Sequence, residues 1–219
     1  MVFDGFPIFD PRPVGDLMES LFPGHGSAIM NAWRSRQFEY QWLRALSGHY
    51  VDFLQATKDS LLFAFKQQRL ELTDDKMTQL LAEYVNLRVW PDAHMAVARL
   101  RQDGLRLAFL SNMTGPMLHT AIVRNGLHGI FEEVMSTDSV RTYKPDPRAY
   151  QLAEQKLSLS RKEILFVAFA GWDAAGAKWF GYPTFWVNRL DSPAEELGVA
   201  ADSSGPNLQT LIRFVEEAA

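Results

Sequence analysis

The N-terminal segment Val2-Phe3-Asp4-Gly5-Phe6-Pro7-Ile8-Phe9-Asp10 is a short apolar run followed by an aspartate and a turn. An acid at the carboxyl end of a first β-strand lies where open α/β sheets bind their ligands. Three later segments place polar residues in the same way: Leu110-Ser111-Asn112, Lys144-Pro145-Asp146-Pro147 and Gly171-Trp172-Asp173. Because the carboxyl ends of parallel strands meet at one edge of a sheet, we expect these segments to gather around Asp4.

Two stretches of different pattern follow this N-terminal segment. Residues 14–88 have an almost purely helical pattern, with apolar residues from Ile29 to Leu46 near the helical period. Farther along, helices and strands alternate, which predicts a parallel sheet with right-handed crossovers. The expected strands cover residues 105–110, 131–135, 164–169 and 184–187, and the expected helices 93–102, 116–125, 147–157, 173–180 and 206–217. The helical stretch is therefore expected to be a cap, inserted after the first strand, over the carboxyl edge of the sheet.

The composition bounds the class of protein. The chain has 219 residues, a formal net charge of -4 and no cysteine. The charge argues against nucleic acid or an anionic membrane as a partner, and without cysteine neither disulfides nor thiolate chemistry is expected. No apolar run reaches the roughly 18 residues of a spanning helix, and the N-terminus lacks the pattern of a signal peptide. We therefore expect a cytoplasmic protein.

The types of the gathered residues indicate a chemistry. A carboxylate such as Asp4 can attack carbon or phosphorus and form an ester, and Lys144 beside it would keep it ionised. Ser111 and Asn112, with the N–H groups of the helix that follows, would bind a carboxylate or phosphate. Asp173 would fix Lys144 or help to activate water. A lone acid of this kind is more often a turn or capping residue, so the coincidence of these placements is what favours a catalytic site.

A metal is not expected at this site. Magnesium-assisted phosphoryl transfer needs several carboxylates around the ion. The residue two positions after Asp4 is Phe6 rather than an acid, and Asp173 has no adjacent second carboxylate. We therefore expect neither metal nor cofactor, and a phosphatase is the less favoured alternative.

These segments resemble the haloacid dehalogenase superfamily and, within it, the L-2-haloacid dehalogenases. The likeness covers nearly the whole chain and includes residues 33–44, 143–150 and 172–177. It implies an α/β fold with a Rossmann-like parallel-sheet core, residues 1–13 and 89–219, and a helical cap, residues 14–88. It also implies a homodimer and a metal-independent hydrolase of a small 2-substituted carboxylate. In such a reaction the aspartate displaces the substituent at the α-carbon, and water then hydrolyses the ester.

The resemblance also implies roles for single residues. Asp4 is the nucleophile, and Arg34 from the cap receives the leaving group with Asn112 beside it. Ser111 helps to hold the substrate carboxylate. The remaining polar residues, which serve the nucleophile, the water and their hydrogen-bond network, are Lys144, Asp173 and Tyr150.

An apolar wall is expected to complete the site. Its residues are Phe6, Phe38, Phe53, Phe169 and Trp172. For Arg34 the alternative is a solvated helix charge, and for Phe38 and Phe53 it is the ordinary core of the cap.

The sequence departs from the family pattern next to these residues. The first motif is one residue shorter than usual and lacks its threonine, and Pro7 offers no N–H to the turn. Phe6 stands where the family has tyrosine, and Ala168 and Ala170 stand where it has serine and asparagine. These changes leave two alternatives open. One is a ring-opening C–N hydrolase of L-azetidine-2-carboxylate, and the other is a non-catalytic protein that binds a small carboxylate.

Overall fold

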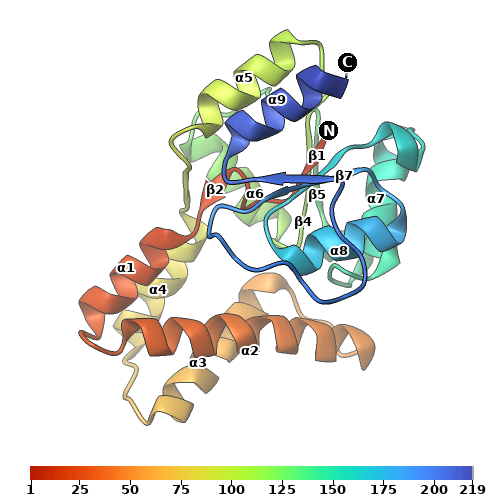
Figure 1. Ribbon diagram of the computed structural model, residues 1–219. Coiled ribbons are helices and arrows are strands. Elements are labelled where there is room, and N and C mark those ends of the chain that lie inside the picture. Colours follow the sequence, from red (N-terminus) through yellow and green to blue (C-terminus); the bar gives the residue numbers. More distant parts are fainter. Residues whose placement is uncertain (219) are drawn as a thin grey trace.

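A parallel sheet forms the centre of the protein. The computed structural model describes residues 1–218. Six strands lie in the order β5-β4-β1-β6-β7-β8, and all neighbours pair in parallel. Figure 1 shows strands β1, β4, β5 and β7 at the centre of the molecule. The strands are β1 (Val2–Phe3), β4 (Ala108–Ser111), β5 (Glu133–Ser136), β6 (Phe166–Ala168), β7 (Thr184–Val187) and β8 (Ser203–Gly205). From β1 the chain builds the sheet first to one side, with β4 and β5, and then to the other, with β6, β7 and β8. The residues that follow β1 therefore lie at the point where open sheets bind ligands.

Helices cover both faces of the sheet because side chains alternate along each strand. Phe3 and Phe109 pack with α5 (Ala93–Gln102), α6 (Gly115–Arg124) and α9 (Leu208–Ala218). Val2 and Ala108 face the opposite way and pack with α7 (Pro147–Leu157) and α8 (Gly171–Phe180). The two short 3-10 helices are η1 (Thr137–Val140) and η2 (Arg161–Glu163). The predicted α/β class is confirmed.

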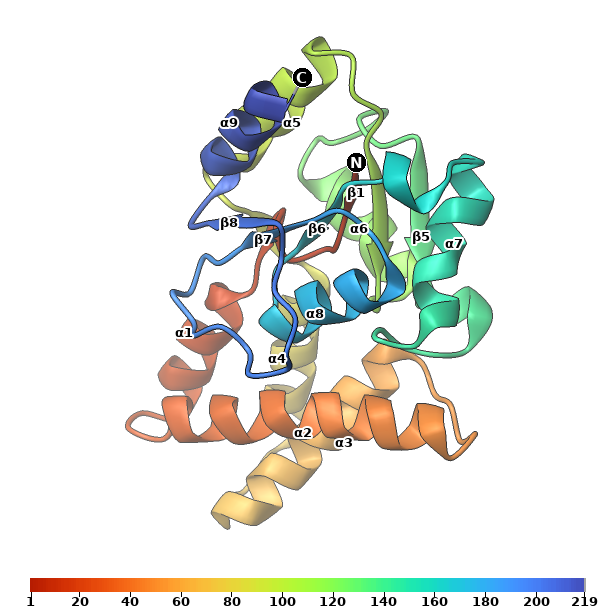
Figure 2. The same cartoon turned by 45° about the vertical axis from the view of Figure 1, so that its right-hand side comes forward.

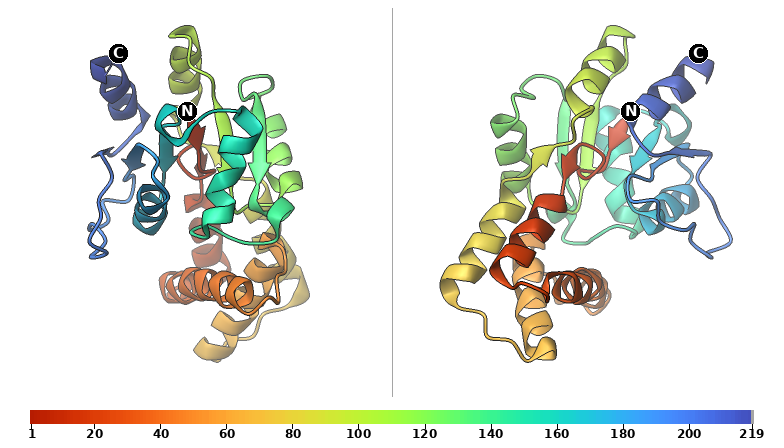
Figure 3. Two further views of the ribbon diagram at one scale, coloured as in Figure 1. Left: turned by 90° about the vertical axis from the view of Figure 1, so that its right-hand side faces the viewer. Right: turned by 60° about the vertical axis from the view of Figure 1, so that its left-hand side comes forward.

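Four helices lie together at the carboxyl edge of the sheet (Figures 2 and 3). They are α1 (Arg12–Leu21), α2 (Gly26–Leu46), α3 (Phe53–Gln68) and α4 (Asp74–Val85). The chain enters and leaves this group through β2 (Phe9–Asp10) and β3 (Arg88–Val89), which pair antiparallel. The division into a core and a cap at residues 13/14 and 88/89 stays a prediction.

The secondary structure follows the sequence pattern closely, with two exceptions. Strands β2, β3 and β8 have two or three residues each, too few for a periodic signal, and the sequence did not predict them. The apolar stripe expected from Ile29 to Leu46 is wrong at its end, where Leu46 is 87% exposed. Within α2, Gln37 and Gln41 are buried instead. Gln37 hydrogen-bonds to Thr57 of α3 and Tyr84 of α4, and Gln41 to Asn112 at the sheet edge. Within the described part of the chain, no helix is both long and apolar enough to span a membrane.

Candidate active site

Asp4 lies directly after β1, at the centre of the sheet edge, and is only 7% exposed. Its Oδ1 atom accepts hydrogen bonds from Lys144 Nζ at 2.9 Å and from Ser111 Oγ at 3.2 Å. Its Oδ2 atom accepts a longer bond, 3.3 Å, from the backbone N–H of Phe6. Ser111 ends the neighbouring strand β4, so the sheet register itself brings it beside Asp4. The carboxylate is thus oriented by three donors from three separate segments.

Lys144 joins two buried carboxylates. Its Nζ atom lies 2.5 Å from Asp173 Oδ2, and Tyr150 donates from its hydroxyl to Asp173 Oδ1 at 2.7 Å. Burial alone would lower the pKa of Lys144, but the charges of Asp173 and Asp4 outweigh it and raise that pKa. Burial also raises the pKa of Asp173 to about 6, against the opposing effect of Lys144. One ammonium does not fully offset the desolvation of two carboxylates in a low dielectric, so Lys144 stays charged while the pKa of Asp173 stays above its ordinary value.

The orientation of the Asn112 side chain is fixed by its neighbours. The backbone N–H of Lys144 donates to Asn112 Oδ1 at 2.8 Å, and Thr137 Oγ1 donates to the same oxygen at 3.2 Å. Since a backbone N–H can only donate, the other end of this amide must be Nδ2. Nδ2 donates to Gln41 Oε1 at 3.2 Å, and Trp42 Nε1 holds the backbone carbonyl of Lys144 at 3.2 Å. Helix α2 therefore positions both Asn112 and Lys144.

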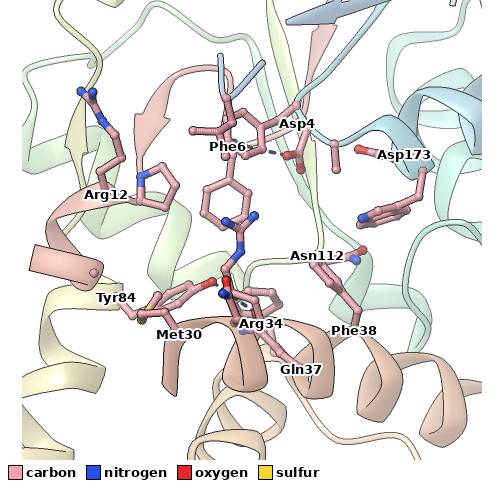
Figure 4. Close-up of a pocket in the computed structure, with 18 of the residues that line it drawn as sticks. Asp4, Phe6, Arg12, Met30, Arg34, Gln37, Phe38, Tyr84, Asn112 and Asp173 are labelled. Atoms are coloured by element: carbon pink, nitrogen blue, oxygen red, sulfur yellow. Dashed lines mark hydrogen bonds between the residues drawn. The ribbon is translucent and has the colours of Figure 1, made fainter. Parts of the chain in front are cut away.

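One face of α2 forms the wall opposite Asp4. Met30, Arg34 and Phe38 recur at helical spacing along this face and point toward the sheet edge (Figure 4). The Arg34 guanidinium makes no hydrogen bond or ion pair with residues 1–217. Burial raises the pKa of the neighbouring Tyr84, and the charge of Arg34 opposes that shift. Arg34 is thus a cation inside the cavity with donors to offer a ligand.

A cavity of about 450 Å³ separates Asp4 from α2. Its walls include eleven of the twelve residues that the sequence predicted: Asp4, Phe6, Arg34, Phe38, Phe53, Ser111, Asn112, Lys144, Phe169, Trp172 and Asp173. Tyr150 is the exception. It is fully buried behind Asp173 and does not line the cavity, so it reaches a ligand only through that carboxylate.

Sequence reasoning missed several residues of the site. Met30, Gln37 and Tyr84 line the cavity, and Gln41 lies behind Asn112. A signal for the two glutamines was present, because polar residues at 37 and 41 continue the helical spacing of Met30 and Arg34. Nothing in the pattern of α4 distinguishes Tyr84 from an ordinary core residue.

Three of the residues that depart from the family pattern lie close to Asp4. Ala170 lines the cavity, Ala168 is fully buried at the end of β6, and Pro7 is buried in the turn after Asp4. The carbonyl oxygen of Pro7 accepts two hydrogen bonds from Arg189, at 2.9 and 3.2 Å. Hydrogen bonds from Arg189 to the Pro7 carbonyl therefore stabilise this turn, although Pro7 has no N–H to donate. Among residues 1–217 no three histidine, cysteine or acidic side chains gather at a distance suited to a metal ion.

The fold and the site together define an α/β protein with a ligand cavity between the carboxyl edge of its sheet and a layer of helices. A family model, haloacid dehalogenase-like hydrolase, matches residues 12–181. The chain belongs to this family of hydrolases, which confirms the resemblance found in the sequence.

Relatives of known name match almost the full length. Haloacetate dehalogenase H-2 of Moraxella sp. (strain B) is 38% identical over 208 residues, covering 95% of this chain and 93% of the relative. The (S)-2-haloacid dehalogenase of Pseudomonas sp. (strain YL) is 39% identical over 212 residues, covering 97% and 91%. Both relatives are named for removing halogen from small carboxylic acids.

Solved structures show the same likeness. A crystal structure of an L-2-haloacid dehalogenase is 40% identical, with a TM-score of 0.96, and covers 98% of this chain and 97% of that one. The L-2-haloacid dehalogenase of Xanthobacter autotrophicus with chloropropionic acid covalently bound is 33% identical, with a TM-score of 0.90, and covers 100% and 98%.

Proposed function

We propose that this protein hydrolyses the carbon–halogen bond of 2-halocarboxylates, with Asp4 as the nucleophile. The observation that carries the proposal is the setting of Asp4, an oriented carboxylate at one wall of a cavity that has the unpaired cation Arg34 opposite it. The names of the full-length relatives support this substrate class, and so does the covalent chloropropionic acid complex of one of them.

In the first step an Asp4 oxygen attacks C2 of the substrate. We assign the attack to Oδ2, because Oδ1 already accepts from Lys144 and Ser111 while Oδ2 accepts one 3.3 Å bond. The new C–O bond forms as the C2–halogen bond breaks, and the halide leaves with the bonding electrons. Arg34 and the free hydrogen of Asn112 Nδ2 lie where they would stabilise the departing anion.

In the second step water attacks the carbonyl carbon of the Asp4 ester. Asp173 takes the proton of that water, and the products are a 2-hydroxycarboxylate and regenerated Asp4. With its pKa at about 6, Asp173 is mostly ionised at neutral pH and remains basic enough to accept a proton. Burial raises the pKa of Tyr150 well above its ordinary value, so its hydroxyl stays a donor that orients Asp173.

Bromide release from racemic 2-bromopropionate tests the proposal. Asp4→Asn should lower the rate at least ~10³-fold, because the amide is a poor nucleophile. Asp10→Asn is the matched control, since Asp10 is equally buried and pairs with Arg12 but does not itself line the cavity. Equal rates for the two variants would refute the assignment of Asp4.

One observation favours a second candidate, the opening of L-azetidine-2-carboxylate. Pro7 and Ala170 replace polar groups near Asp4, and Phe6 and Phe169 lie against each other at 5.8 Å. A ring ammonium next to Asp4 needs fewer neutral hydrogen-bond donors than a halide does. Protein that leaves this amino acid intact while releasing bromide rules this candidate out. A small carboxylate that raises the melting temperature without being consumed would instead favour a binding protein.

We further propose a cytoplasmic homodimer that binds no nucleic acid. The net charge of -4 supports the last point. Leu43 and Leu46, 59% and 87% exposed at the end of α2, offer an apolar surface for a second copy. Sedimentation should give twice the monomer mass, and Leu46→Asp should shift the equilibrium toward monomer.

A further inference from the structure

The cavity is larger than the reacting part of a small substrate requires. A 2-halopropionate has six non-hydrogen atoms. Even if each took the ~30 Å³ that a water molecule takes in the liquid, they would fill about 180 Å³. The cavity measures about 450 Å³. More than half of its volume therefore lies beyond a substrate bound at Asp4.

The extra volume runs along two helices. On α2 the lining residues continue from Phe38 back through Arg34 and Met30 to Ser27. This distance is eleven residues, or about 16 Å of helix. On α1 they include Gly15 and others at helical spacing. Figure 4 shows Asp4 and Arg12 on opposite sides of the cavity with Arg34 between them. The space is thus an elongated channel rather than a round pocket.

The middle of this channel is apolar and its far end is polar. Phe6 contacts Tyr84 edge-on with ring centres 6.5 Å apart, and Phe53 lies 6.0 Å from the same ring. Met30 extends this wall along α2. The far end is lined by side chains that are exposed to solvent: Arg12, Asp16, Glu19, Ser27 and Asn31. An apolar chain bound in the middle of the channel would be shielded from water along its whole length. Each added methylene that is shielded in this way strengthens binding.

We propose that the substrate is a 2-halocarboxylate with a medium-length or bulky apolar group on C2. The carboxylate and halogen lie between Asp4 and Arg34, and the apolar group extends along α1 and α2 toward the polar end. The proposal rests on the function proposed above and leaves its chemistry unchanged. The Asp4–C2 bond forms as the C2–halogen bond breaks, and water then releases a 2-hydroxycarboxylate with the same apolar group.

Two parallel series of ligands test the substrate class. Bromide release is measured from 2-bromopropionate through 2-bromodecanoate, and binding of the matching 2-hydroxy acids is measured by calorimetry. We expect kcat/KM and affinity to rise about two- to fourfold per methylene until the channel is full. A fall in affinity from the short to the long hydroxy acids would overturn the proposal. If no substrate released bromide but the affinity for the hydroxy acids still rose with chain length, only the proposed function would be refuted.

A substitution that narrows the channel gives an independent test. Gly15→Leu adds a side chain where a Cβ would have no heavy atom within 4 Å, and it improves helix propensity. We expect the ratio of kcat/KM for 2-bromodecanoate over 2-bromopropionate to fall at least tenfold. Ser20→Leu is the control, because it adds the same side chain to α1 outside the cavity lining. An unchanged ratio in Gly15→Leu would contradict the path assigned to the apolar group.

Discussion

Replacing Asp173 by asparagine should change how the free energy of unfolding depends on pH. Burial raises the pKa of Asp173 to about 6 in the folded protein, whereas the unfolded chain returns it to about 3.9. Between these values the folded state binds a proton that the unfolded state does not. The stability contributed by this group is therefore fully present at low pH and is lost as the pH rises toward 6.

The size of the effect follows from the two pKa values. A difference of about 2 units, at about 1.4 kcal/mol per unit, makes about 3 kcal/mol in total. Part of this titration lies at lower pH, so a measurement from about pH 4.5 to about pH 7.5 captures about 2 kcal/mol. Asparagine has nearly the same shape and can still accept from Lys144, but it does not titrate.

Urea unfolding of both proteins across this pH range measures the difference directly. The wild type should lose about 2 kcal/mol relative to Asp173→Asn as the pH rises. Asp75→Asn, which removes an exposed carboxylate in the first turn of α4, serves as control and should leave the slope unchanged. Parallel curves for wild type and Asp173→Asn would show that burial does not raise the pKa of Asp173 in the folded protein.

Two further predictions concern residues packed around the site. Gly176→Ala should lower the free energy of unfolding by roughly 1–3 kcal/mol, because a Cβ there would lie 2.5 Å from the Tyr150 hydroxyl. Urea unfolding should show no such loss for Gly15→Ala, whose Cβ meets no heavy atom within 4 Å. Gln41→Leu removes the acceptor of Asn112 Nδ2 and should lower kcat for bromide release about tenfold with little change in KM. A change confined to KM would show that Gln41 does not act through Asn112.

The sheet and the charged part of the site could be predicted because each rests on a local signal. Apolar runs that end in Asp4 or Ser111 mark the carboxyl ends of strands, and parallel pairing brings those ends together. Lys144 follows no strand directly. It reaches Asp4 because Asn112 and Trp42 hold its backbone from two sides. That contact is tertiary, so the sequence could place Lys144 at the same edge of the sheet as Asp4 but could not show what holds it there.

The rest of the site depends on which side of a helix faces the sheet. Polar residues such as Gln37 and Gln41 are typical of an exposed helix face, yet they are buried here. Gln37 is covered by α3 and α4, and Gln41 by Asn112 at the sheet edge. Leu46 shows the opposite case, an apolar residue left exposed beyond the end of the contact. The sequence of α2 alone cannot show which of its polar residues are buried and which of its apolar residues are exposed. That depends on how α2 packs against the other helices and the sheet. For the same reason, the sequence does not predict the length of the cavity.

A single turnover in H₂¹⁸O, with enzyme in excess over 2-bromopropionate, shows whether Asp4 forms the covalent ester. Mass spectrometry of the N-terminal peptide, with fragmentation to separate Asp4 from Asp10, locates the label. Water that hydrolyses the Asp4 ester leaves one ¹⁸O in the Asp4 carboxylate, and the product hydroxyl carries unlabelled oxygen. Label in the product hydroxyl, with none in Asp4, would mean that water attacks C2 directly and that Asp4 is not the nucleophile.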